Sequence, residues 1–93
     1  NSESSYKIKD LAYGDNYLRI EVIANSSDLD TLNNICRELK ETYTYEYCKG
    51  FLVYFIDNKS DSFNDAYADF FGDNEKNLYT LTLFENNKRY KVD

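Results

Sequence analysis

The chain lacks histidine, methionine, proline and tryptophan, and it has only three glycines and two cysteines in 93 residues. Without histidine, neither a Ser-His-Asp triad nor a Cys-His dyad can form. The glycines Gly14, Gly50 and Gly72 are too far apart to build a glycine-rich loop that binds phosphate. We therefore expect a protein that is not an enzyme and binds no cofactor. A small hydrolase that uses two of the many carboxylates is the remaining catalytic hypothesis.

The chain also has too few ligands for a structural zinc site. Such a site takes four ligands, and two cysteines without histidine cannot supply them. Residues 57–65 are rich in side-chain oxygen atoms, and their spacing is similar to that of a calcium-binding loop. Compared with that pattern, Lys59 stands where a ligand belongs, Ser62 replaces the turn glycine and Ala68 replaces the closing glutamate. We interpret this segment as a solvated surface loop and expect no metal site.

The two cysteines, Cys36 and Cys48, fall on an expected helix and just before an expected strand. A disulfide between them is an open alternative in an exported protein, because both side chains can point into one layer of the core. The geometry for bridging from within a helix is narrow, however. We expect two buried free thiols that act as small hydrophobic side chains.

Positive charge is limited, with 11 Lys and Arg against 17 Asp and Glu and a net charge of −6. The basic residues form no cluster, so binding to nucleic acid or to anionic lipid is not expected. An acidic surface does suit a basic protein partner. An acidic immunity or inhibitor protein that neutralises a basic enzyme is therefore the alternative to the main functional hypothesis.

No apolar run approaches the roughly 18 residues that span a membrane, so we expect no membrane insertion by this domain. Residues 1–5 are small and polar, like the tether that follows a signal peptide or a lipid-modified cysteine. The wealth of Asn, Lys and Tyr is typical of proteins from AT-rich bacterial genomes. These features predict an extracytoplasmic bacterial protein, exported or lipid-anchored, with a flexible tether over 1–5 and a single domain over 6–93.

Hydrophobic residues make up 42% of the chain and aromatic residues 17%, which is enough to build a core. Residues 6–13 and 17–22 read as two strands of a hairpin, with a turn at 14–16. Apolar residues then recur at steps of three and four, which predicts an amphipathic helix over 28–42. Its apolar stripe consists of Leu29, Leu32, Cys36, Leu39 and Tyr43, and Ile35 widens it.

The apolar run of residues 51–56 predicts a strand that is covered on both faces in the middle of the sheet. We expect Leu32, Cys36 and Leu39 to pack against Leu52, Tyr54 or Ile56 on that strand.

Residues 63–71 fit either a helix that is capped near Asp61 or Ser62 and ends at Gly72, or a strand. The chain closes with a hairpin over 78–92 that turns at 86–87. The predicted fold is α+β in two layers, with one sheet of five or six strands and one main amphipathic helix packed on one face.

Tyrosine is the most abundant aromatic residue, and Tyr43, Tyr45 and Tyr47 alternate along the chain. If this stretch is extended, the three rings project from one face and offer large, rigid contact area with polar tips. Packing of the same rings at a junction between helix and strand is the alternative. We predict these three tyrosines as the partner-binding residues, with another protein or a cell-envelope component as the partner.

The order of four segments, 18–22, 27–35, 53–57 and 66–68, resembles that of small bacterial domains of unknown function that follow lipoprotein signals or membrane anchors. The resemblance implies an antiparallel or mixed sheet with one main helix, an extended segment over 66–70 and an extracytoplasmic setting. It supplies no site residues. The leading hypothesis is a non-enzymatic binding module.

Overall fold

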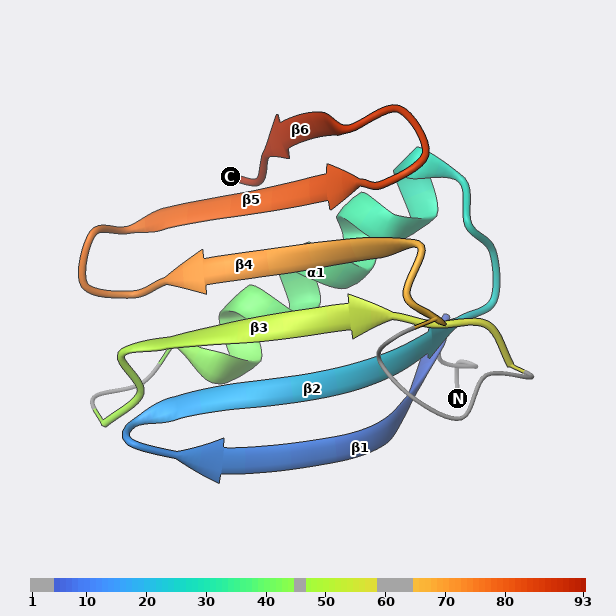
Figure 1. The fold of residues 1–93 in the computed structure, drawn as a ribbon. Coiled ribbons are helices and arrows are strands. Elements are labelled where there is room, and N and C mark those ends of the chain that lie inside the picture. Colours follow the sequence, from blue (N-terminus) through green and yellow to red (C-terminus); the bar gives the residue numbers. More distant parts are fainter. Residues whose placement is uncertain (1–4, 45–46, 59–64) are drawn as a thin grey trace.

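The computed structural model describes residues 5–44, 47–58 and 65–93. Within these residues the chain forms two layers, a six-stranded mixed sheet and one helix that crosses behind it (Figure 1). The strands lie side by side in chain order, from β1 at one edge to β6 at the other. This confirms the predicted α+β fold. The elements are β1 (Tyr6–Gly14), β2 (Tyr17–Ala24), α1 (Leu29–Tyr43), β3 (Gly50–Phe55), β4 (Ala68–Asp73), β5 (Leu78–Leu83) and β6 (Lys88–Lys91).

Both predicted hairpins are present, and asparagine or aspartate makes each turn. Between β1 and β2, Asp15 and Asn16 have φ angles of 54° and 69°, the left-handed conformation of a two-residue hairpin turn. Between β5 and β6, Asn87 has a φ of 53°, and the side chain of Asn86 accepts a hydrogen bond of 3.2 Å from the backbone of Lys88. Local turn chemistry therefore sets both pairings.

Helix α1 connects β2 to the parallel strand β3 and passes behind the sheet, so the crossover is right-handed (Figure 1). The helix begins after Asp28, whose carboxylate accepts a hydrogen bond of 3.2 Å from the backbone N–H of Thr31. It ends at Tyr43, one residue beyond the predicted boundary. The predicted stripe faces the sheet, and its buried members are Leu32, Ile35, Cys36 and Leu39.

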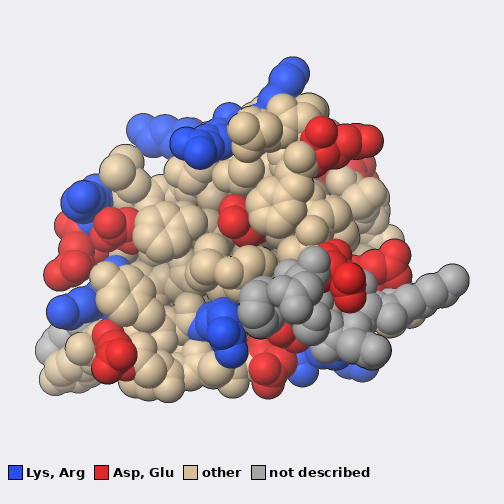
Figure 2. Space-filling view, viewed as in Figure 1, with Lys and Arg blue, Asp and Glu red and all other residues tan. Residues whose placement is uncertain are grey.

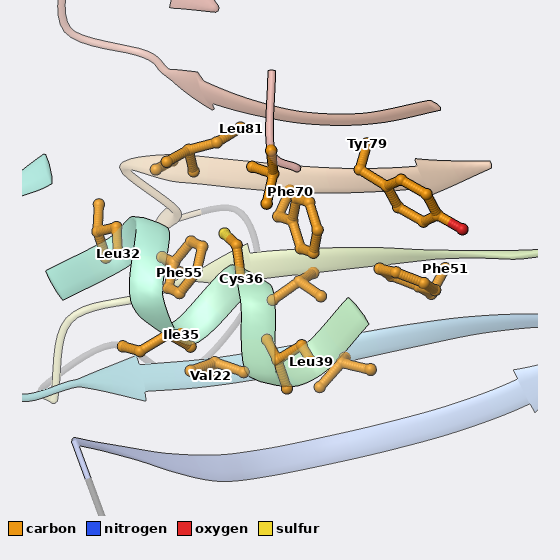
Figure 3. Packing of buried hydrophobic residues seen from close by; sticks show 14 of the residues in the cluster. Val22, Leu32, Ile35, Cys36, Leu39, Phe51, Phe55, Phe70, Tyr79 and Leu81 are labelled. Carbon is orange, nitrogen blue, oxygen red and sulfur yellow. The ribbon is translucent and has the colours of Figure 1, made fainter. Parts of the chain in front are cut away.

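The core lies between α1 and one face of the sheet (Figure 3). On β3, Phe51, Val53 and Phe55 are the residues fully buried there. We expected Leu52, Tyr54 or Ile56 to pack against the helix, and this was wrong for Leu52 and Tyr54, which lie half-buried on the opposite face. The expectation that this strand is covered on both faces was therefore also wrong. Ile56 is buried directly after β3, outside the core cluster. Apolar residues occupy every position of this run, so the pairing of β3 with its neighbouring strands determines which alternate residues point toward the helix. The pairs are Leu18 with Phe51, Ile20 with Val53 and Val22 with Phe55.

The ambiguous segment contains a strand, β4, in which Ala68 and Phe70 are buried. Gly72, the expected helix stop, lies inside this strand opposite Phe51. A Cβ at residue 72 would overlap with the ring of Phe51, so the glycine makes room for that ring. Residues 61 and 62, the expected caps of the helical alternative, lie outside the described residues, as does most of the loop that resembles a calcium site.

The boundary of the predicted tether also falls partly outside the described residues, which begin at Ser5. The carbonyl of Ser5 accepts a hydrogen bond of 2.9 Å from the backbone of Asn25, directly after β2. Ser5 thus continues the pairing of the first hairpin.

Candidate binding surface

The helix covers one face of the sheet, and the other face, which we call the open face, carries no second layer from the described residues (Figure 1). The strand register aligns its side chains in rows that run across the sheet. The groove row consists of Ala12, Arg19, Leu52, Phe71, Thr80 and Lys91. The acidic row, two residues further along the strands, consists of Asp10, Glu21, Tyr54, Asp69, Thr82 and Arg89.

A groove with a volume of about 450 Å³ lies at the end of this face where β2 and β3 begin. Gly50 contributes no side chain there, and the ring of Tyr17 lies over it. A Cβ at residue 50 would lie 3.0 Å from Cε1 of Tyr17 and 2.6 Å from the carbonyl oxygen of Gly72. The nine lining residues are Ala12, Tyr13, Gly14, Tyr17, Leu18, Arg19, Phe51, Leu52 and Phe71.

The groove is mainly apolar and open to solvent. Tyr17 and Phe71 are each 44% exposed, although both are large aromatic residues. Figure 2, which shows this face, has a broad uncharged area across its middle. Acidic atoms near the centre and basic atoms below them interrupt this area, and most other charged groups lie toward the rim. An exposed apolar patch with a polar rim is typical of an interaction surface.

Asp69 lies in the middle of the acidic row and is half-buried. Burial raises the pKa of its carboxyl group, while a hydrogen bond with Thr82 and the charge of Arg89 act in the opposite direction. Tyr54 lies beside it on β3. The row therefore places a partly desolvated negative charge next to the groove.

The three predicted tyrosines do not form one extended row. Tyr43 belongs to the last turn of α1 and packs against the core, with its ring centroid 6.3 Å from that of Phe51. Burial raises the pKa of its hydroxyl group. Tyr47 is 71% exposed, and its backbone carbonyl accepts a hydrogen bond of 3.1 Å from the hydroxyl of Tyr13. Tyr45 lies outside the described residues.

Asn74 ties this junction to the turn between β4 and β5. Its amide group donates hydrogen bonds of 3.1 Å to the carbonyl of Tyr43 and 2.9 Å to that of Cys48. Its side-chain oxygen accepts a hydrogen bond of 2.7 Å from the hydroxyl of Tyr79. These bonds hold Tyr43 at the end of the helix, where its ring serves packing.

The open-face residues Tyr17, Leu52 and Phe71 were missed in the sequence analysis. One signal for them was available, since adjacent strand residues point to opposite faces. A strand therefore sets Phe70 and Phe71 on opposite faces of the sheet, and Phe71 is the exposed ring. The apolar run of β3 likewise placed Leu52 on the face opposite Phe51.

Both cysteines are free and buried. Burial raises the pKa of the Cys36 thiol, and it also raises that of Cys48. A thiol with a raised pKa is a poor nucleophile at neutral pH. Among residues 5–44, 47–58 and 65–93, no cluster of three metal-ligating side chains occurs.

These features define a two-layer α+β domain with a partly apolar sheet face on which the described residues build no second layer. Comparison of the chain with protein-family models, with curated proteins and with solved structures finds no match. Within the described part of the chain, α1 falls short of the length and apolar character that a membrane-spanning helix requires.

Proposed function

We propose that this domain is a non-enzymatic interaction module of an exported or lipid-anchored bacterial protein, and that it binds a protein partner through the groove on the open face. The observation that carries the proposal is the exposure of Tyr17 and Phe71 on either side of an apolar groove. Aromatic side chains at the centre of an interface supply much of its binding free energy.

Binding at this groove removes apolar surface from water, which is favourable by about 25 cal/mol per Å². The walls of the groove lie on paired strands, so little conformational entropy is lost when a partner binds. Binding at the groove therefore requires no rearrangement of the sheet.

The acidic row defines the chemistry of the partner. Asp10, Glu21 and Asp69 lie two residues along their strands from Ala12, Arg19 and Phe71 of the groove row. A partner that inserts an apolar side chain into the groove would meet these carboxylates with its neighbouring groups. We infer that the partner presents an apolar side chain flanked by Lys or Arg.

Phe71 and Phe84 provide a matched test, because both are 44% exposed and only Phe71 lines the groove. A partner is captured with the tagged domain from the cell envelope and purified, and its affinity is measured by calorimetry. Phe71→Ala is expected to weaken binding by more than about 1 kcal/mol, or roughly fivefold in Kd. Phe84→Ala is expected to change it little. Equal losses for the two variants would contradict the groove as the contact surface.

The tyrosines predicted from the sequence belong in the same experiment. Tyr45→Ala and Tyr47→Ala test whether the segment after the helix contributes to the same partner. A loss for Tyr45→Ala or Tyr47→Ala together with an unchanged affinity for Phe71→Ala would move the binding surface to that segment.

The net charge of −6 favours the inhibitor hypothesis as the second candidate. An inhibitor of a basic enzyme would bind more slowly and weakly as salt screens the attraction. Capture of a basic cytosolic enzyme that is lost at high salt and is indifferent to Phe71→Ala would favour this candidate over the first.

A further inference from the structure

The two edges of the sheet differ in their protection against pairing with another strand. The β6 edge is four residues long and carries Lys88, Arg89 and Lys91, and short charged edges discourage further pairing. The β1 edge is nine residues long, and every residue of it except Tyr6 is exposed. Among the strands of the described residues, none lies beside its outer edge. β1 is therefore the edge at which the sheet can be extended.

A β-bulge places several apolar side chains of β1 on one face. The register with β2 shifts between Ile8 and Asp10, so that Ile8 pairs with Val22 and Leu11 with Ile20. Ile8 and Leu11 therefore both lie on the helix side of the sheet, although three residues separate them. Both remain exposed, because β1 extends beyond the cover that α1 provides.

We propose that β1 pairs with β1 of a second copy of this chain. The two strands run antiparallel, and the two-fold axis passes between Lys9 and Asp10. This pairing joins two six-stranded sheets into one continuous sheet.

The position of the axis follows from which face each residue occupies. Ile8 then lies opposite Leu11 of the second copy, and Tyr6 lies opposite Tyr13, with all four on the helix side. The two bulges meet at the axis, so the shift in one strand is matched by the shift in the other. Apolar and aromatic cross-strand pairs of this kind stabilise a sheet.

One neighbouring axis, through Asp10, pairs the strands less well. An axis through Asp10 sets two like charges against each other, which is destabilising. It also sets Ile8 against Ala12, which points to the open face. The proposed axis instead sets Lys9 across from Asp10 of the second copy.

The dimer also brings two grooves together. Ala12, Tyr13 and Gly14 of β1 line the groove, so each groove lies next to the β1 edge. The second copy thus borders each groove, and one assembly presents two binding surfaces.

Leu11 and Leu78 provide a matched pair for the first test, since they are 43% and 51% exposed and only Leu11 lies on β1. Mass is measured by light scattering and sedimentation over a concentration series. We expect a dimer that forms as concentration rises, that is lost in Leu11→Lys and that persists in Leu78→Lys. A monomer at every concentration up to about 1 mM would overturn the proposal, as would a dimer that survives Leu11→Lys.

Disulfide trapping tests the register without relying on a disruptive variant. Ile8→Cys is mixed with Leu11→Cys under diamide, a mild oxidant that takes up the two thiol protons and electrons. The wild-type chain, with both native cysteines buried, is the control. We expect the mixed pair to cross-link faster than either variant alone, because directly opposite residues are within disulfide reach. Self-cross-linking of Ile8→Cys or of Leu11→Cys that is faster than cross-linking of the mixed pair would overturn the proposed axis, because this axis sets each of these residues three positions away from its own copy.

Discussion

A side chain at residue 72 would collide with the ring of Phe51, which lies opposite it on β3. That ring also contacts two other aromatic rings of the core, with centroids 5.4 Å away at Phe70 and 6.0 Å away at Tyr79. The ring is fully buried, so a shift of it would disturb these neighbours. Gly72 is therefore required by packing, since its backbone φ is not positive.

Gly72→Ala is expected to lower the free energy of unfolding by about 1 to 3 kcal/mol, the usual effect of forcing extra volume into a packed core. Gly14→Ala is the matched control, because no atom lies within 4 Å of its Cβ position and its φ is not positive. We expect this control to change stability by less than about 0.5 kcal/mol. Urea denaturation of both variants measures the difference in their free energies of unfolding. Similar free energies would show that the Phe51 ring can shift to accommodate the new methyl group.

Helix α1 contributes the whole of one layer of the core, and Leu39 is one of its fully buried residues. Leu39→Ala removes buried methyl groups and leaves a cavity between the layers (Figure 3). We expect a loss of about 2 to 5 kcal/mol in the free energy of unfolding, measured in denaturant. Glu38→Ala, one position along and exposed, should have little effect. A loss under about 0.5 kcal/mol for Leu39→Ala would mean that the helix packs differently.

Elements whose pattern is local could be predicted from the sequence. The stripe of Leu32, Cys36 and Leu39 defined the helix and its buried face, and Asn86–Asn87 marked the last turn. The inward face of β3 could not be predicted, because its apolar residues show no alternation. Residues 66–70 fitted two periodicities, and pairing with β3 and β5 on either side decided between them.

The candidate site was less predictable than the fold. Its residues come from β1, β2, β3 and β4, and they meet only because the sheet aligns them. The predicted row of Tyr43, Tyr45 and Tyr47 was inferred from their alternate positions in the sequence. Such a row forms only if the chain is extended from Tyr43 onward. The helix continues through Tyr43 because that ring adds to the buried stripe.

The thiols report on the stability of the whole molecule. Cys36 lies between the two layers and is 0% exposed, so a reagent reaches it only when the domain opens. We expect two free thiols per chain in denaturant without reductant, and very slow labelling of Cys36 in the native protein. A maleimide assay followed by mass spectrometry measures both. A monomer with no free thiol in denaturant would instead show a disulfide between Cys36 and Cys48.

The order of the strands makes β3 the junction of two locally connected units. Short turns link β1 to β2 and join β4, β5 and β6 in series, whereas longer segments, 25–49 and 56–67, flank β3. An isolated hairpin is at best marginally stable in water. The two units become one sheet only through β3, which pairs with β2 on one side and β4 on the other. Cooperative folding of the chain thus depends on β3, which no tight turn connects to either neighbouring strand.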